Sequence, residues 1–556
     1  MLALGLCDGH DAGACLARDG GIVAAVSEER LTRRKRQAGF PYQSIQCCLE
    51  LAGVSASAIH QIAVAERSGR SLHRLVDYFY RRTDPNRLMN RRSNRASSAL
   101  QNFLARQARW SDRDAAFSKN ILEKRLAEIG LRAPLVLVDH HLAHTMSAAK
   151  GSGFAEALVI TMDAFGDGIS GTVSHWKDGR LEMLERIPYP HSPALLYGLV
   201  NAELGYGEGE EGKVTAMAAQ SDSTAAKGLF ESLFTSNQGS FRMARFTPAW
   251  LKRAVSQFAP ADIAAGLQLC IQDLLSALVG YWMKKTGARN LSLAGGLFAN
   301  VRLNQVVAEA NGCMDLYVFP HMGDGGLCVG AALAASDDPT PTGQFIPVVG
   351  PAPDCSTIDG LSTASLINRP LDEAAIKAMA GRLAEGWAIG IVNGPMEFGP
   401  RALGHRSILF SAQHPELARR ISDALERSLL MPYAPVVREE DLKLFTSARA
   451  WKAFSCMTAT ADALPGIADR FPTAVHVDGT MRIQTVSRKN DPLLHDILTA
   501  YGEWVSPPLL INTSFNRHKE PIVADVSQAM DLFIKSPLAG LVAGQRYLEK
   551  RGVAEK

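Results

Sequence analysis

The sequence predicts a mixed α/β protein whose first 335 residues hold a duplicated domain, and three observations predict it. An apolar strand at 157–161 leads to Asp163 and a glycine-rich turn. A second strand, at 316–319, leads to Asp324 and another glycine-rich turn. A third apolar strand, at 291–294, is followed by two glycines and then by a helix. Such recurrence indicates two copies of one α/β unit with a ligand in the cleft between them.

Length and composition are those of a soluble globular protein. A chain of 556 residues is too long to fold around one hydrophobic core, and its length predicts roughly three to four domain-sized units. The chain has 47% apolar residues, 21% charged residues and a formal charge of +3. This overall balance does not require nucleic acid or a membrane as a binding partner. The nine cysteines include no C-x-x-C pair, which argues against a zinc–cysteine site and favours a reduced, cytoplasmic setting.

No secretory or membrane-spanning segment is predicted. The apolar run after Met1 is too short for a signal peptide and lacks a basic start. The most apolar helical stretch, 267–283, carries Gln268, Gln272 and Asp273, which is typical of an amphipathic helix. We therefore expect no membrane partner.

The first elements form a hairpin followed by a helix and a strand. Asp19-Gly20-Gly21 predicts the hairpin turn, because glycine supplies the positive φ that tight turns need. His10 lies in the loop after the first strand, where a lone histidine is more often exposed or structural than catalytic. The predicted strands are 3–7, 14–18, 22–26 and 62–65, and the predicted helix is 42–51.

Residues 67–114 form an arginine-rich insertion. It holds twelve arginines and no lysine, which favours recognition of phosphate or carboxylate. Tyr78 and Trp110 lie among the arginines, so stacking on a base or sugar fits as well. A solvated helical insertion explains the composition equally well.

Two histidines and two aspartates form a candidate metal site. The strand at 134–138 runs into a segment in which His140 and His144 lie four residues apart. On a helix this spacing puts both imidazoles on one face, within reach of one metal ion. Asp163 and Asp324, at the ends of the two recurring strands, supply carboxylates. The four residues favour a metal–nucleotide cleft.

A second unit follows a proline-rich, aperiodic stretch at 337–370, which is typical of a linker. A helix at 371–385 and a strand at 388–392 lead to a rigid glycine- and proline-rich loop at 394–408. This loop, hereafter the arginine loop, carries two arginines, as a phosphate-binding loop needs. Polar clusters near residues 480 and 514 point to the same pocket.

Six motifs spread over the whole chain carry a family resemblance. They are Glu28-Glu29-Arg30 with Gly39-Phe40-Pro41, Asp139-His140-His141-x-x-His144, Ala294-Gly295-Gly296-x-x-x-Asn300-Val-x-x-Asn304, Met396-Glu397-Phe398-Gly399-Pro400-Arg401-Ala402-Leu403-Gly404-x-Arg406-Ser407-Ile408, His476-x-Asp478-Gly479-Thr480-x-Arg482-x-Gln484 and Asn512-Thr513-Ser514-Phe515-Asn516. In this order they resemble the nodulation-factor and tobramycin-type O-carbamoyltransferases. The motif around Arg401 is the most specific of the six.

The resemblance implies two domains and two reactions. Residues 1–336 would form an actin-like ATPase (RNase H-like) domain, similar to the subunit that transfers threonylcarbamoyl to tRNA, with the insertion at about 67–114. Residues 337–370 would be a linker and 371–556 a YrdC-like domain. There, carbamoyl phosphate and ATP would give carbamoyladenylate; in the actin-like domain an acceptor hydroxyl would attack the carbamoyl carbon and expel AMP. Carbamoyladenylate hydrolyses in bulk water, so two sites in one chain with a protected route between them suit these two reactions.

The resemblance also implies the site residues. The transfer site would bind a metal, usually iron, through His140, His144, Asp163 and Asp324, with His10 as general base. The adenylate would be lined by Gly166, Asp167, Gly168, Gly296 and Asn300. ATP with Mg²⁺ and carbamoyl phosphate would contact Arg401, Arg406, Arg427, His476, Arg482, Asn512, Ser514 and Asn516. Lys35, Arg81 and Arg82 would border the acceptor entrance.

The acceptor stays open, because the chain departs from the family pattern at Gly13, Ala164 and the loop before Val214. Our first hypothesis is a natural-product hydroxyl, as expected of a biosynthetic enzyme. The alternative is a hydroxymethylated nucleobase or another polyanion, bound by the insertion. A non-catalytic nucleotide-binding protein of actin-like fold is a third reading, disfavoured by the retained histidines and arginine loop. The oligomeric state is open, a homodimer included.

Overall fold

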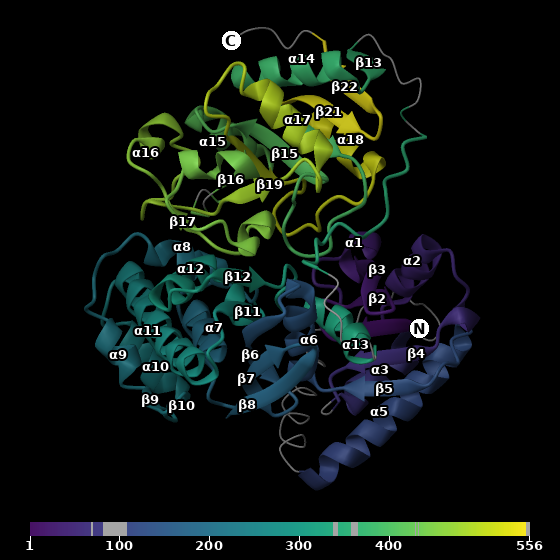
Figure 1. The fold of residues 1–556 in the computed structure, drawn as a ribbon, viewed down its shortest axis with the longest axis vertical. Coiled ribbons are helices and arrows are strands. Elements are labelled where there is room, and N and C mark those ends of the chain that lie inside the picture. The colour runs from purple at the N-terminus through teal and green to yellow at the C-terminus, as the bar shows by residue number, and fades with distance from the viewer. Residues whose placement is uncertain are drawn as a thin grey trace.

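A computed structural model of the chain describes residues 1–67, 70–81, 108–336, 343–356, 358, 365–428, 430–431 and 433–551. Figure 1 shows three lobes: the purple N-terminal part, the teal part that follows it, and the green to yellow C-terminal part packed across both. The first two lobes each contain one five-stranded sheet, and the third contains an eight-stranded sheet. The α/β class predicted from the sequence is confirmed.

The first two sheets repeat one topology. In the order β3-β2-β1-β4-β5, the first three strands are antiparallel neighbours and the last two run parallel to β1. The second sheet, β8-β7-β6-β11-β12, has the same order and directions. The predicted duplication is therefore confirmed. The strands are β1 (Leu2–Cys7), β2 (Gly13–Arg18), β3 (Gly21–Ser27), β4 (Gln61–Ala65), β5 (Leu135–Val138), β6 (Glu156–Gly166), β7 (Ile169–Lys177), β8 (Arg180–Pro188), β11 (Asn290–Ala294) and β12 (Asp315–Val318).

Two equivalent helices, α6 (His140–Ser152) and α13 (Leu327–Ala334), follow the last strand of each copy and pack together between the lobes (Figure 1). They approach so closely that a Cβ added to Gly330 would lie 1.8 Å from the carbonyl oxygen of Ala143. Small residues at this contact therefore set the distance between the two halves of the duplicated domain. The side chain of Asp139 accepts from the backbone N–H of Leu142, which starts α6 at His140.

Further helices cover the two sheets. They are α1 (Glu28–Thr32), α2 (Tyr42–Ala52), α3 (Ser71–Arg81), α5 (Ala108–Glu128), α7 (Pro193–Glu203), α8 (Glu211–Ala218), α9 (Lys227–Glu231), α10 (Pro248–Val255), α11 (Pro260–Thr286) and α12 (Val301–Ala310), with a small β9 (Phe234–Asn237) and β10 (Ser240–Met243) hairpin. Among the described residues, α11 alone is long and apolar enough to cross a membrane, and 72% of its most apolar window is buried. Such burial is what the core helix of a folded lobe shows.

The third lobe is an open mixed sheet of order β13-β22-β21-β14-β15-β20-β16-β19 flanked by helices. Its strands are β13 (Leu366–Pro370), β14 (Ala388–Val392), β15 (Arg406–Ser411), β16 (Ala434–Arg438), β19 (Gln484–Val486), β20 (Leu510–Ser514), β21 (Leu538–Ala543) and β22 (Arg546–Lys550), with β17 (Ala461–Asp462) and β18 (Thr480–Met481) as a separate pair. Its helices are α14 (Glu373–Ala384), α15 (Pro415–Ala424), α16 (Ile467–Arg470), α17 (Pro492–Tyr501) and α18 (Val526–Lys535). The arginine loop joins β14 to β15.

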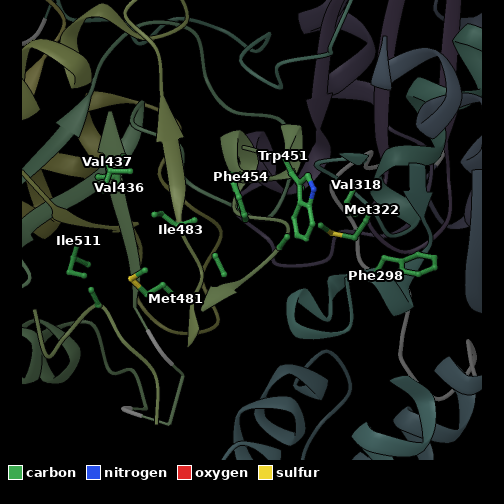
Figure 2. Packing of buried hydrophobic residues seen from close by; sticks show 14 of the residues in the cluster. Phe298, Val318, Met322, Val436, Val437, Trp451, Phe454, Met481, Ile483 and Ile511 are labelled. Carbon is green, nitrogen blue, oxygen red and sulfur yellow. The ribbon is translucent and has the colours of Figure 1, made fainter. Parts of the chain in front are cut away.

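The third lobe and the rest of the chain share one hydrophobic cluster. Figure 2 shows Trp451 and Phe454 of the third lobe beside Val318, the last residue of β12, and Met322, in the loop after it. All four side chains are buried. The domain boundaries predicted at 336 and 371 stay predictions, although β13 already begins inside the stretch predicted as a linker and pairs with β22.

Candidate active site

Four side chains from three elements converge where the two copies of the duplicated domain meet. His140 and His144 lie one turn apart on α6, Asp163 lies in β6, and Asp324 lies directly before α13. The β6–β7 register shifts between Met162 and Gly166, which takes Asp163 out of regular strand pairing. One ligand atom from each of the four residues lies within 4.8 Å of the others. The structure therefore brings together the four predicted metal ligands.

The donor set fits a divalent cation. His144 Nε2 is 3.3 Å from Asp163 Oδ2 and 3.8 Å from Asp324 Oδ1, and His140 Nε2 is also 3.8 Å from Asp324 Oδ1. The ring nitrogens of both histidines are buried and lack an aligned hydrogen-bond partner. Unsatisfied buried imidazoles that face carboxylates are what a bound ion explains. Two imidazoles and two carboxylates suit Fe²⁺, the predicted metal.

His141, between the two histidines, turns away from this cluster. Its Nδ1 lies 2.8 Å from Thr161 Oγ1 and its Nε2 lies 3.3 Å from the carbonyl oxygen of Ile169. Burial lowers the pKa of His141 well below its usual value, so the ring is neutral and packs in the interior. This placement agrees with a packing role.

His10 borders the metal cluster and is half exposed to solvent. Its Nε2 is 3.1 Å from Asp324 Oδ2, and its Nδ1 is 2.9 Å from Asp11 Oδ2. Burial of the site opposes its protonation, but Asp324 and Asp11 outweigh burial and raise the pKa of His10 to about 9. The structure thus places the predicted base against a predicted metal ligand.

The glycines and Asp167, predicted to line the adenylate, lie around α6 and β6. A Cβ on Gly166 would fall 2.1 Å from the ring of His140, so only glycine fits there. Asp167 Oδ2 accepts from the backbone N–H of His140 at 2.8 Å, which makes this carboxylate a cap of α6. Gly168 has a φ of 88° and open space around it. The backbone N–H of Gly296 donates to Asp163 Oδ2 at 3.1 Å.

Asn300 caps a helix and bonds a neighbouring side chain. Its Oδ1 accepts from the N–H of Leu303 at the start of α12, and its Nδ2 donates to Gln268 at 2.7 Å. Both polar ends of the amide are therefore engaged within the fold.

In the third lobe, Arg401 and Arg482 carry unpaired guanidinium groups. The Nε of each is buried without a hydrogen-bond partner, and neither has a carboxylate partner within the described part of the chain. Burial lowers the pKa of Arg401 to about 10, and burial together with Arg401 lowers that of Arg482. Two partly buried guanidinium groups that repel each other and have no acidic partner among the described residues favour a polyanion as their ligand.

Arg406 and Arg427 are bonded within the fold. Arg406 donates to five backbone carbonyl oxygens, those of Pro351, Asn393, Gly394, His405 and Ala524. Arg427 donates to the side chains of Thr513, Ser514 and Asn516 and thereby shapes the predicted nucleotide loop. Asn512 donates to Gln484 at 2.7 Å. These contacts favour a scaffolding role for both arginines, and their predicted contact with substrate stays a prediction.

The remaining predicted residues lie at the edges. His476 Nδ1 is 3.3 Å from Asp478 Oδ1 on a partly exposed loop. Lys35 binds Glu29 at 2.8 Å on the surface. Arg82 and the side chain of Arg81 lie outside the described residues, as does most of the insertion.

Sequence reasoning missed Glu66, which directly follows β4. Its Oε1 is 3.4 Å from His140 Nδ1, on the side of the ring away from Asp324. No motif spacing links residues 66 and 140. The parallel pairing of β4 with β5, the strand that leads into α6, brings them together.

Comparison with known proteins places the chain in a family. Residues 3–333 match the model of the carbamoyltransferase N-terminus, and residues 380–550 match that of the carbamoyltransferase C-terminus. The chain is 33% identical to nodulation protein NolNO of Sinorhizobium fredii, over 98% of this chain and 79% of the relative. It is also 33% identical to nodulation protein NolO of Bradyrhizobium diazoefficiens, over 74% and 79%. A solved structure of full-length HypF aligns with 60% of this chain and 55% of its own, at 15% identity and a TM-score of 0.33. The chain therefore belongs to the carbamoyltransferase family and is a carbamoyltransferase enzyme.

Proposed function

We propose that the chain is an ATP-dependent O-carbamoyltransferase with an actin-like transfer domain and a YrdC-like activating domain. The observation that carries this proposal is the cluster of His140, His144, Asp163 and Asp324 with His10 at its open edge. A buried metal site beside a half-exposed histidine provides a Lewis acid and a base for one reaction centre.

The third lobe would make the activated carbamoyl group. Carbamoyl phosphate, water and Mg²⁺-bound ATP would give carbamoyladenylate, phosphate and pyrophosphate. Arg401 and Arg482 would bind the phosphate groups, because two neighbouring guanidinium groups without acidic partners match a polyanion in charge. Arg427 would hold the 512–516 loop in shape for the nucleotide.

The duplicated domain would transfer the carbamoyl group. The cation, with Fe²⁺ as the candidate, would polarise the carbamoyl carbonyl when held by the four ligands. A cation held by Asp324 would offset the charge of that carboxylate and so lower the pKa of His10 towards its usual value, at which an imidazole acts as a base near neutral pH. His10 would then take the proton of the acceptor hydroxyl, which attacks the carbamoyl carbon as AMP leaves.

We further propose a natural-product hydroxyl as the acceptor. The arginine-rich composition of 67–114 supports the alternative, a hydroxymethylated nucleobase or another polyanion. Mass spectrometry of a panel of both acceptor classes, incubated with enzyme, ATP, carbamoyl phosphate and Fe²⁺, tests the proposal. We expect one acceptor to gain one carbamoyl group with AMP release. If the wild-type enzyme makes no carbamoyladenylate with any metal, the proposal is wrong.

A further inference from the structure

The ring of His140 is fixed from two sides. A Cβ at Gly166 would fall 2.1 Å from its Cγ, so the backbone there packs directly on the imidazole. At the edge of the ring, Nδ1 faces Glu66 Oε1 at 3.4 Å and Nε2 faces Asp324 Oδ1 at 3.8 Å. His140 therefore presents only Nε2 to the metal cluster, while Nδ1 is left for Glu66.

Glu66 occupies this position at a conformational cost. It is buried, and its φ of 68° lies in the left-handed region that side chains other than glycine rarely adopt. A buried carboxylate in a strained backbone persists only where its surroundings hold it, and such outliers cluster at functional sites. The contact with His140 supplies a reason for the strain.

Arg70 holds the carboxylate from the other side. Its Nη2 lies 2.5 Å from Glu66 Oε2, and the pair is largely buried. The backbone N–H of Arg70 donates to Asp114 Oδ2 at 3.3 Å, which ties it to α5. A Cβ on Gly9 would lie 3.0 Å from Arg70 Nη2, so the pair also abuts the loop that carries His10.

We propose that Glu66, held by Arg70, is a positioning residue of the metal centre that accepts the Nδ1–H of His140 and directs Nε2 to the cation. The inference rests on the proposed function, since it assumes that His140 binds a metal. A carboxylate behind a ligand histidine fixes its tautomer and orientation and raises its basicity. Because α3 begins directly after Arg70, the base of the arginine-rich insertion would be part of this support.

Cobalt binding to the full-length, metal-stripped protein tests the role directly. Co²⁺ is titrated by its visible absorption and by competition with a chelator for wild type, E66Q and E66A. We expect E66A to bind Co²⁺ ~10–100-fold more weakly, with a shifted absorption band. E66Q keeps an acceptor oxygen towards Nδ1 and should recover part of the affinity. The control is E156Q, because Glu156 contacts His175 at 2.9 Å from the opposite end of β6 to Asp163.

A second variant and a parallel assay make the result of this experiment interpretable. If E66A does not fold, E66A/R70Q removes the acceptor oxygens at position 66 and the charge of Arg70 together, and carries the same expectation. Co²⁺ affinity within twofold of wild type and an unchanged spectrum, in E66A or in E66A/R70Q, would overturn the inference. Failure of wild type to bind Co²⁺ would overturn it together with the metal centre, whereas carbamoyladenylate formation, measured in parallel, tests the activating half of the proposed function separately.

Discussion

At the scale of single residues, Arg401 and Arg482 should decide substrate binding in the third lobe. Removing either guanidinium should raise KM for carbamoyl phosphate or ATP ~10–100-fold, since a hydrogen bond to a charged group contributes about 1.5–3 kcal/mol. Steady-state kinetics of R401A and R482A measure this. R488A is the control, because Arg488 is 72% exposed and pairs only with Asp496 in the described part of the chain. Unchanged KM values in both variants would remove these arginines from the site.

His321 makes a pH-dependent contribution to stability at the contact between the lobes. Its ring packs 4.9 Å from that of Phe398 in the arginine loop, and its Nε2 lies 3.4 Å from Ser27 Oγ. Burial lowers the pKa of His321 to about 4, below its unfolded value near 6.5. The unfolded chain therefore binds the proton first, so this contribution falls as the pH drops from about 6.5 to about 4.

Replacement of His321 by glutamine should reduce the acid dependence of stability. Glutamine keeps a polar nitrogen near Ser27 but does not titrate in this range. Urea denaturation at pH 7 and pH 5 should show a smaller loss for H321Q than for wild type. An equal loss in the two proteins would mean that His321 is protonated in the folded state.

At the scale of elements, the contact between α6 and α13 should set the geometry of the metal ligands. G330A places a methyl group 1.8 Å from the carbonyl oxygen of Ala143 and should destabilise the protein by ~1–3 kcal/mol. Co²⁺ affinity should fall as well, because α6 carries two ligands and α13 directly follows the loop of Asp324. G198A is the matched control, since its Cβ would meet nothing within 4 Å. Equal unfolding free energies for G330A and G198A would contradict this role of the contact.

The sequence predicted more of the elements than of the contacts between them. The sequence predicted the duplication from the recurrence of Asp163 and Asp324 after two strands, but both aspartates lie in the second copy, in β6 and after β12. The repeat is seen instead in the matching strand orders of the two sheets, which pair strands far apart in the sequence. Asp167 caps α6, a contact that the sequence did not predict, and its place beside the adenylate stays a prediction. Glu66 was missed because only the pairing of β4 with β5 brings it to His140. The edge strand β13 resembled a linker, since Asn368, Arg369 and Pro370 break any apolar alternation.

At the scale of the whole molecule, α1 and the residue that follows it link the two proposed centres. Arg30 donates to the carbonyl oxygen of Gly399 at 2.9 Å, and Arg33 donates to those of Pro521 and Ile522, each at 2.7 Å. R33A should loosen the third lobe and lower the carbamoylated product formed per AMP about tenfold, because two charge-assisted bonds are lost. R18A, a change at an exposed arginine of the same lobe, is the control. A wild-type ratio in R33A would show that the two centres do not depend on this link.

The central claim is that one chain makes carbamoyladenylate in one lobe and consumes it in another. The most direct test quantifies carbamoyladenylate, AMP and carbamoylated acceptor by mass spectrometry for wild type, H10A and R401A. We predict that H10A forms carbamoyladenylate but transfers ~10²–10⁴-fold more slowly. R401A should form little intermediate yet transfer from supplied carbamoyladenylate at the wild-type rate. Loss of the same step in both variants would contradict the division of labour between the two lobes.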